Sequence, residues 1–199
     1  MTESSRDSAS RSPIYTVGHS TRTIPEFVQL LESANVNTVV DVRSIPKSRR
    51  NPDYNVDRLP ELLAERGIEH EHFAELGGRR GRSRDVPTEV NAFWENQSFH
   101  NYADYALTQQ FGLGLVRLIA LAARRRCAIM CSEAVWWRCH RRIIADHLLT
   151  RGHEVIHLMS PSHHTPAVLT RGAVVEGDRV TYPRPTGTAA DTLRRLPSK

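Results

Sequence analysis

The chain has 199 residues, 39% hydrophobic and 25% charged, which is typical of one globular domain. Basic residues outnumber acidic ones by 27 to 22, and 25 of the 27 are arginine; this content fits both anion recognition and a bias in genome base composition. Three cysteines are too few for a disulfide scaffold, no apolar run approaches the roughly 20 residues of a membrane span, and the polar N-terminus lacks a signal peptide's apolar core, so we expect a cytoplasmic protein without membrane contact.

Short apolar runs alternate with helical stretches, which predicts βαβ units and a mainly parallel sheet. After a first strand at 14–17, a helix is expected from Ile24, because Thr23 and Glu26 have capping-box spacing. Further strands are expected at 37–40, 68–73, 127–131 and 154–159. Further helices are expected at 56–66 with Gly67 as C-cap, at 102–125 with a break near Gly112 and Gly114, and at 135–151.

Four remaining stretches complete the predicted fold. Residues 75–84 lack apolar periodicity and are expected to form a loop, whereas 173–182, with Gly177 and Asp178 at its centre, is typical of a hairpin. Residues 1–12 and 184–199 have the composition of disordered tails. The fold class is therefore α/β: a single three-layer domain over 13–183 with a mainly parallel central sheet, plus a small C-terminal β-hairpin.

Polar residues follow several of the predicted strands. In an open parallel sheet, ligands bind beyond the carboxyl ends of the strands. A shared ligand site is therefore expected there, against the alternative of ordinary strand-end polarity. The residues at these ends are His19, Ser20, Asp41, Arg43, Cys131, Glu133, His157 and Ser160.

Cys131 stands between a buried strand and a predicted helix, where the helix dipole would lower its thiol pKa and make it a candidate nucleophile. Glu133 would oppose that effect by repulsion, and a structural role is the alternative. The Cys-x5-Arg spacing of cysteine phosphatases is absent, because Trp137 occupies the position where arginine is required. A likeness to sulfurtransferases rests on position alone.

Cys131, Cys139 and His140, with His19 as a fourth candidate, have side chains that can bind a metal. Structural zinc sites usually show paired ligands two to four residues apart, and no second pair occurs in the chain. Adjacent residues of a helix also diverge by about 100°, so Cys139 and His140 would not face one ion. We therefore expect no metal and no other cofactor.

Three basic segments favour contact with anions. Residues 136–142 combine two tryptophans with three arginines, and we expect one tryptophan in the core and Trp137 to contact ligand. The glycine- and arginine-rich loop 77–84 has backbone N–H groups free to approach an anion, although a mobile basic loop is the alternative. The loop 43–54 adds Lys47, Arg49 and Arg50. Together the two loops would form a positive rim suited to nucleotide phosphates or a nucleic-acid backbone.

With these residues in view, the chain resembles the domain of unknown function 488 family from Ile14 to about Tyr182. The resemblance implies a compact α/β domain, for which no activity is settled. It is carried by YTVGHSTRT (15–23), DVRSIPKSRRNPDYN (41–55), ELGGRRGRSR (75–84), YADYALT (102–108) and MCSEAVWWRCHRRIIADHL (130–148). The motif residues overlap the strand-end set chosen from topology. Ser132 departs from the small alanine expected there.

These residues are compatible with three kinds of function. An enzyme acting on a nucleotide, nucleic-acid or other anionic substrate would use Cys131, Glu133 and His19 for catalysis. A non-catalytic module that binds nucleotides or nucleic acid would use the basic loops, and a scaffold would need the polar network only for stability. The residues expected to bind ligand are Ser20, Asp41, Arg43, Ser48, Arg49, Tyr54, Arg79, Tyr102, Trp137, His140 and Arg141.

Overall fold

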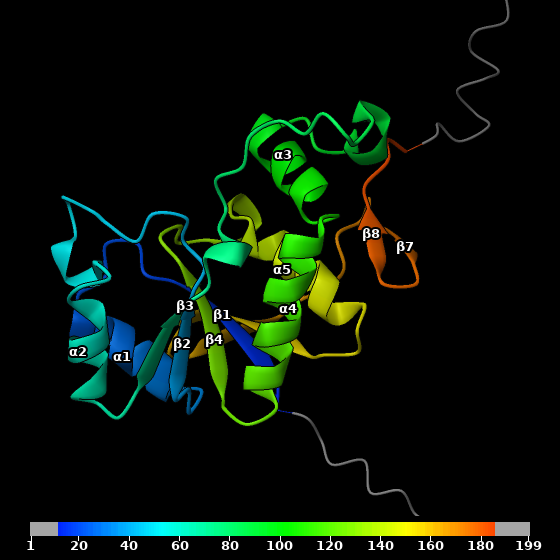
Figure 1. Cartoon of the computed structure of the whole chain (residues 1–199). Coiled ribbons are helices and arrows are strands. Elements are labelled where there is room, and N and C mark those ends of the chain that lie inside the picture. Colours follow the sequence, from blue (N-terminus) through cyan, green and yellow to red (C-terminus); the bar gives the residue numbers. More distant parts are fainter. Residues whose placement is uncertain (1–11, 186–199) are drawn as a thin grey trace, which may run out of the picture.

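The computed structural model describes residues 12–185. The expected tails, 1–12 and 184–199, lie outside the described residues except at 12, 184 and 185. A six-stranded sheet forms the centre of the molecule, with the strand order β3-β2-β4-β1-β5-β6 (Figure 1). Neighbouring strands are parallel except for the edge strand β6, which runs antiparallel to β5 and was not predicted. The strands are β1 (Ile14–Gly18), β2 (Thr38–Asp41), β3 (Glu69–His72), β4 (Cys127–Cys131), β5 (Val155–Ser160) and β6 (His163–Pro166).

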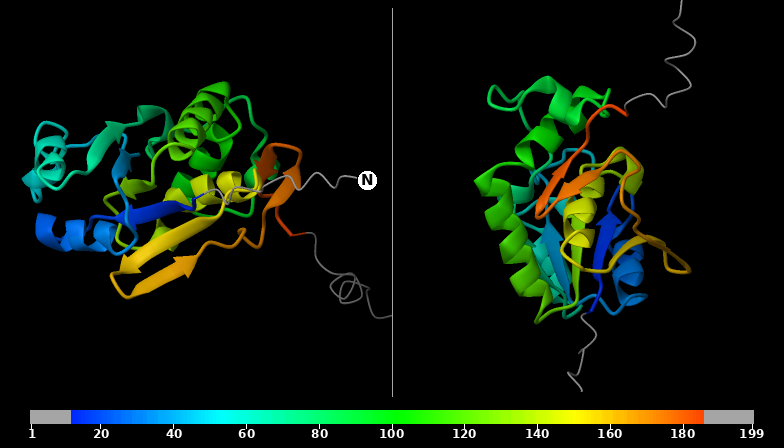
Figure 2. Two further views of the ribbon diagram at one scale, coloured as in Figure 1. Left: turned by 90° about the horizontal axis from the view of Figure 1, so that it is seen from below. Right: turned by 90° about the vertical axis from the view of Figure 1, so that its right-hand side faces the viewer.

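Helices cover both faces of the sheet (Figures 1 and 2). Successive strand residues point to opposite faces, so Val39 packs in the cluster under α1 and α2, and Val40 packs in the cluster under α3, α4 and α5. The three-layer α/β architecture is thus confirmed. The helices are α1 (Ile24–Glu32), α2 (Leu59–Ala64), α3 (Gln97–Tyr105), α4 (Gln109–Ala122) and α5 (Arg141–Leu149).

The direction in which the chain crosses the sheet reverses near the middle of the sheet. From β1 the chain moves outward to β2 and β3, and then returns to insert β4 between β1 and β2. The chain segments that leave β1, β2 and β4 therefore lie close together, beyond the carboxyl ends of these strands. Such switch points are where open α/β sheets bind ligands.

Local sequence signals account for several element ends. The capping box of α1 is confirmed: Thr23 Oγ1 accepts from the Glu26 N–H at 3.4 Å, and Glu26 Oε2 accepts from the Thr23 N–H at 2.7 Å. The predicted hairpin is also confirmed as β7 (Val174–Glu176) and β8 (Arg179–Thr181), with Gly177 at φ +59° in its turn. The hairpin is joined to α5 by a 2.8 Å hydrogen bond from the Tyr182 hydroxyl to Asp146.

The helical predictions for 56–66 and 102–125 need correction. The helix expected at 56–66 is α2, which spans only Leu59–Ala64. Gly67 takes the expected left-handed conformation beyond its end, with φ +68°. The second region breaks at 106–108 rather than near Gly112 and Gly114, because Thr108 caps α4 by accepting from the Phe111 N–H. Gly114 instead allows close packing, since a Cβ there would lie 2.8 Å from the Glu75 Cβ.

The prediction of one helix over 135–151 was wrong. Residues Trp136–Arg138 form a single 3-10 turn, Cys139 is extended at φ −129° and ψ 146°, and α5 starts only at Arg141. Three further 3-10 turns are Pro52–Tyr54, Ala74–Leu76 and Thr88–Asn91. Within residues 12–185 no single helix is long and apolar enough to cross a membrane, and α3 and α4 pass that test only as a pair bent by 78°.

Candidate functional site

A cavity of about 350 Å³ opens beyond the carboxyl ends of β1, β2 and β4. Its walls come from the ends of these strands, the loops after β2 and β3, the start of α3 and the segment 131–140. Its size lies within the range typical of small-molecule sites. The lining residues are His19, Arg43, Ser44, Ile45, Lys47, Ser48, Gly78, Arg79, Ser98, Phe99, Cys131, Ser132, Glu133, Arg138, Cys139 and His140.

Backbone pairing between β1 and β4 continues past both strand ends and positions the cavity floor. The His19 N–H donates to the Cys131 carbonyl at 2.9 Å, and the Ser20 N–H donates to the Ser132 carbonyl at 3.0 Å. Gly18 is required for this approach, because a Cβ there would lie 1.9 Å from the Glu133 carbonyl oxygen. Ser20 takes a left-handed φ of +50°, which turns the chain away from the sheet.

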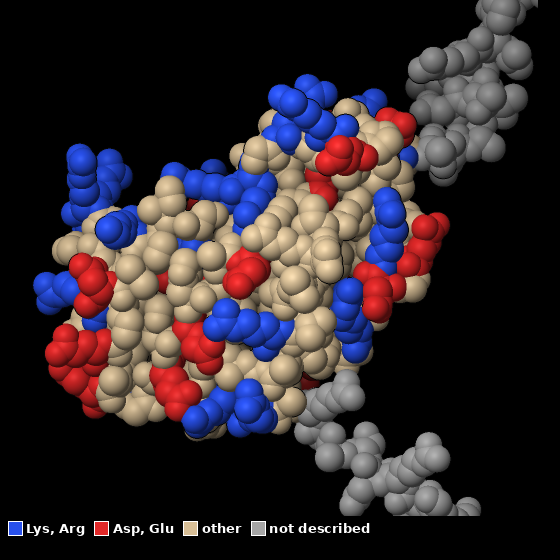
Figure 3. Space-filling model, in the orientation of Figure 1, with Lys and Arg blue, Asp and Glu red and all other residues tan. Residues whose placement is uncertain are grey.

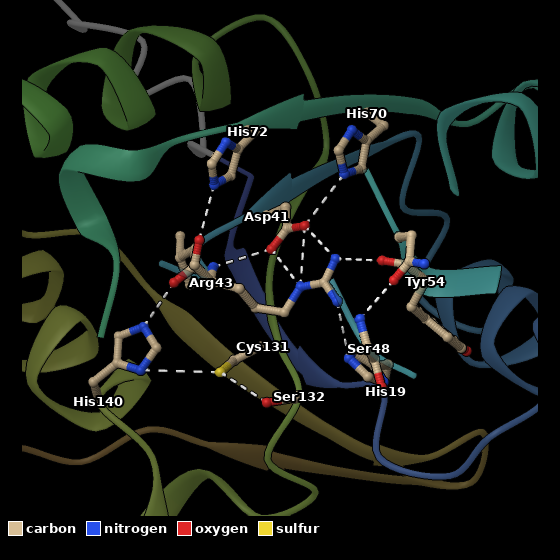
Figure 4. A network of polar contacts seen from close by, with 12 residues as sticks. His19, Asp41, Arg43, Ser48, Tyr54, His70, His72, Cys131, Ser132 and His140 are labelled. Atoms are coloured by element: carbon tan, nitrogen blue, oxygen red, sulfur yellow. Dashed lines mark hydrogen bonds and ion pairs between the residues drawn. The ribbon is translucent and has the colours of Figure 1, made fainter. Parts of the chain in front are cut away.

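Arg43 is the centre of a buried network on one side of the cavity (Figure 4). Its Nε and Nη2 atoms donate to the Asp41 carboxylate, the latter at 2.6 Å, and Nη2 also donates to the Tyr54 carbonyl at 2.6 Å. Nη1 lies 3.3 Å from His19 Nε2. All three guanidinium nitrogens therefore have acceptors within the protein.

His19 and Asp41 hold fixed charge states in this network. His19 Nδ1 lies 3.0 Å from the Ser20 carbonyl, which can only accept, so Nδ1 carries the proton and Nε2 accepts from Arg43. Burial, together with the Arg43 charge, lowers the pKa of His19 to about 4. Burial alone would raise the pKa of Asp41, but the hydrogen bonds from Arg43 and the nearby His70 Nε2, 3.6 Å from Oδ2, outweigh it and lower that pKa to about 2. His19 is thus neutral, and both its nitrogens are engaged.

Two sulfurs and an imidazole converge on the other side of the cavity. Ligand atoms of Cys131, Cys139 and His140 all lie within 4.8 Å of one another. His140 Nδ1 is 3.5 Å from Cys139 Sγ and 4.0 Å from Cys131 Sγ. The expectation that Cys139 and His140 diverge is wrong, because the extended backbone of Cys139 replaces the helical geometry on which it rested.

The expected lowering of the Cys131 pKa is also wrong. A hydrogen bond to Cys139 and burial raise the pKa of the Cys131 thiol. Burial would raise the pKa of Cys139 too, but the hydrogen bond from Cys131 and the charge of Arg141 outweigh it and lower that pKa. Arg141 Nε donates to Cys139 Sγ at 3.3 Å. Thiolate character in the pair therefore resides on Cys139.

Positive side chains surround the cavity mouth. Lys47, Arg79 and Arg138 line it, and within residues 12–185 no hydrogen bond or ion pair engages the charged ends of these three side chains. Among the described lining residues, Glu133 alone carries a carboxylate. Figure 3 shows basic side chains along the upper edge of the molecule, above the strand ends seen in Figure 1.

The residues expected to catalyse or to bind ligand divide between the cavity and its supports, whereas the strand-end residues His157 and Ser160 lie outside the lining. Seven line the cavity: His19, Arg43, Ser48, Arg79, Cys131, Glu133 and His140. Seven others do not: Ser20, Asp41, Arg49, Tyr54, Tyr102, Trp137 and Arg141.

Most of the seven residues outside the lining support it from behind. Tyr54 stacks on His19 with ring centroids 4.1 Å apart, and Tyr102 packs its ring against His140. Arg141, only 1% exposed, donates to the Glu133 carbonyl at 2.6 Å as well as to Cys139. Trp137 is 48% exposed beside Trp136, which stacks on the buried His157.

Sequence reasoning missed Cys139, Arg138 and Phe99 as part of the cavity wall. Cys139 and Arg138 were missed because a helix over 135–151 would point their side chains in directions that differ from those in the structure. Phe99 comes from α3, and no strand-end rule points to a helix that begins 25 residues after β3. Cys139 and Arg138 fall within the MCSEAVWWRCHRRIIADHL motif, which was the available signal.

Comparison with known proteins adds one match. A sequence model of the family described as "domain of unknown function DUF488" matches residues 23–148, from the cap of α1 to the last turn of α5. No curated protein matches the chain, and no solved structure matches it. The matched segment contains every residue that lines the cavity except His19.

Proposed function

We propose that this chain, which belongs to the domain of unknown function DUF488 family, is an enzyme that acts on a phosphorylated substrate of nucleotide size. The proposal rests on the placement of three positively charged side chains, which have no partner among residues 12–185, around a cavity of about 350 Å³ whose floor holds a sulfur and imidazole cluster. A binding site without chemistry has no need of such a cluster at its floor.

Lys47, Arg79 and Arg138 bind the anion in this proposal. Their charged ends are not neutralised by the part of the protein described, so each is available to form a charge-assisted hydrogen bond with an anion. Arg43 also lines the cavity, but Asp41, Tyr54 and His19 accept from four of its five N–H donors, which leaves one N–H on Nη1 for a ligand. The anion therefore binds mainly to Lys47, Arg79 and Arg138, nearer the mouth than the Asp41–Arg43 pair.

Chemistry takes place at the cluster of Cys131, Cys139 and His140, with Glu133 as the group that moves protons. Glu133 lines the cavity and is exposed, so it can exchange protons with solvent and reach a bound substrate. His19 is less suited to this role than the sequence suggested, because its one lone pair already accepts from Arg43.

Calorimetric titration with inorganic phosphate, pyrophosphate and nucleoside mono- and diphosphates tests the anion site. We expect Arg79→Ala and Arg138→Ala to weaken binding of the best ligand about tenfold or more each, and binding to decline with salt. Arg66→Ala is the matched control, since Arg66 is exposed before β3, at the opposite end of the sheet. Equal affinities in all four proteins would contradict the proposal.

Turnover separates an enzyme from a binding module. The wild-type protein is incubated with each ligand that it binds, and products are followed by mass spectrometry. We expect conversion by the wild type, none by Cys131→Ser, and retained anion binding in that variant. Binding without conversion would favour a nucleotide- or nucleic-acid-binding module, for which the exposed Arg49, Arg50, Arg82 and Arg84 extend the positive rim.

A further inference from the structure

The spacing of Cys131, Cys139 and His140 matches the first coordination sphere of a small tetrahedral ion. With zinc–sulfur bonds of about 2.3 Å and zinc–nitrogen bonds of about 2.0–2.1 Å, neighbouring ligand atoms lie about 3.5–3.8 Å apart. Cys139 Sγ and Cys131 Sγ stand 3.5 and 4.0 Å from His140 Nδ1, and no pair in the set exceeds 4.8 Å. Closing the set around an ion would require shifts of no more than about 1 Å.

The imidazole of His140 already presents a lone pair to the two sulfurs. Its Nε2 lies 3.0 Å from the Val42 carbonyl, which only accepts, so Nε2 carries the proton and Nδ1 is free to coordinate. Metal-binding histidines typically donate their second N–H in this way. The Tyr102 ring packs against the His140 ring at a centroid distance of 4.9 Å, and the Tyr102 hydroxyl donates to the Leu76 carbonyl. These contacts fix the orientation of the His140 ring.

Gly78 covers one face of the same ring. A Cβ at this position would lie 2.3 Å from Nδ1 and 2.7 Å from both Cε1 and Cγ. Equal distances to the two ring carbons, so close to the distance from Nδ1, place that Cβ above the ring rather than along the in-plane lone pair. Gly78 therefore packs on the imidazole face and leaves the coordinating direction of Nδ1 open.

The charges around the cluster suit a divalent ion held by two thiolates. Two thiolates and one divalent cation have no net charge, so the neighbouring guanidiniums are not repelled. The N–H···S hydrogen bond from buried Arg141 to Cys139 stabilises a negative sulfur and fixes its direction.

We propose that Cys131, Cys139 and His140 bind one zinc ion, with the fourth coordination position open to the cavity. Sulfur and imidazole ligands select zinc over magnesium and calcium, which require oxygen ligands. Three protein ligands and an open position are typical of catalytic zinc sites. This inference goes beyond the proposed function, because the ion binds whether or not a phosphorylated substrate does, and it makes Cys131 a ligand rather than a nucleophile.

Zinc binding to the reduced, chelator-treated full-length chain is measured in competition with a chromophoric chelator. We expect about one ion per chain, with release of the Cys131 thiol proton to solvent. Cys131→Ser, Cys139→Ser and His140→Gln should each weaken zinc binding by at least about 100-fold, since each removes one of three protein ligands. Cys127→Ser is the matched control, because Cys127 is a buried free cysteine at the start of β4, outside the cluster.

Two measurements on the wild-type chain alone guard against variants that fail to fold. Cobalt substitution should give sulfur-to-cobalt charge-transfer absorption and the strong visible bands of a tetrahedral site. Zinc should also protect Cys131 and Cys139 from alkylation, as read by mass spectrometry. Absence of zinc binding by the wild type, a cobalt spectrum without sulfur ligation, or equal zinc affinity in Cys131→Ser and Cys127→Ser would overturn the inference. Phosphate binding by the zinc-free wild type tests the anion site separately.

Discussion

The two sides of the cavity differ in how completely their polar groups are satisfied. On one side, the arginine half (His19, Asp41 and Arg43), each guanidinium nitrogen has a protein acceptor and His19 has partners on both nitrogens. On the other side, the sulfur half (Cys131, Cys139 and His140), acceptor atoms converge on one another, and within residues 12–185 Arg141 is the one charged donor that reaches them. A closed network holds the fold together, whereas convergent lone pairs are available for a ligand.

The largest expected effect comes from opening the arginine half. Asp41→Ala leaves the Arg43 guanidinium buried without its counter-ion, so the free energy of unfolding should fall by about 3–5 kcal/mol. Urea denaturation followed by circular dichroism measures this loss in the free energy of unfolding. Asp53→Ala is the control, because the Asp53–Arg58 pair is exposed at 3.5 Å and its loss should change stability by less than about 1 kcal/mol. Similar losses in the two variants would show that the arginine half is not a closed structural unit.

Acid should weaken the arginine half through His19. Its folded pKa of about 4 lies below its usual value of 6.5, so between these values the unfolded chain binds the additional proton. The stability contributed by neutral His19 is thus complete above pH 6.5 and is lost as the pH falls toward 4, by up to about 1.4 kcal/mol per pH unit. Buried His147 and His157, whose pKa values are lowered to about 3, act in the same direction.

A non-titrating variant isolates the contribution of His19. In His19→Gln the amide oxygen can still accept from Arg43, but the side chain does not titrate. The free energy of unfolding of the wild type should therefore fall more than that of the variant when the pH is lowered from 6.5 to 5. Urea midpoints at several pH values give this difference. A difference that stays constant over that interval would show that His19 does not titrate as the structure requires.

Gly78 provides a way to disturb the sulfur half without removing a ligand. In Gly78→Ala the new Cβ would lie 2.3 Å from His140 Nδ1, so the ring must move, and we expect a loss of about 1–3 kcal/mol of unfolding free energy. Gly81→Ala is the control, because nothing lies within 4 Å of a Cβ there. Thermal unfolding of both proteins makes the comparison. Equal melting temperatures would mean that the His140 ring is not held by Gly78.

The smallest effect on stability is expected at the cavity mouth. Arg79 makes no ion pair in the described structure, so Arg79→Ala should change the free energy of unfolding by less than about 0.5 kcal/mol while weakening phosphate binding. Urea denaturation and calorimetry on the same protein sample separate the two quantities. A large stability loss would place Arg79 with the arginine half as a structural residue.

Particular residues show how far sequence reasoning reached. Apolar runs and the Thr23–Glu26 capping box located β1, α1, β2, β4 and β5, because these signals depend on residues adjacent in the chain. The strand-end rule also brought His19, Arg43, Cys131 and Glu133 to one edge, and the structure places all four on the cavity wall. The rule could not show that Arg43 donates to His19, since that depends on a contact between the ends of two strands that are not neighbours in the sheet.

By itself, the sequence determined the α/β class, most of the strands and the edge of the sheet where polar residues gather, because periodicity and strand-end position are local properties. Only the tertiary structure decided that Cys139 is extended and faces the cavity with Cys131 and His140. The physical reason is that packing of the 136–140 segment against β1, β2 and the Gly78 loop overrides its helical periodicity. Which side chains share one cavity is set by these contacts between distant segments.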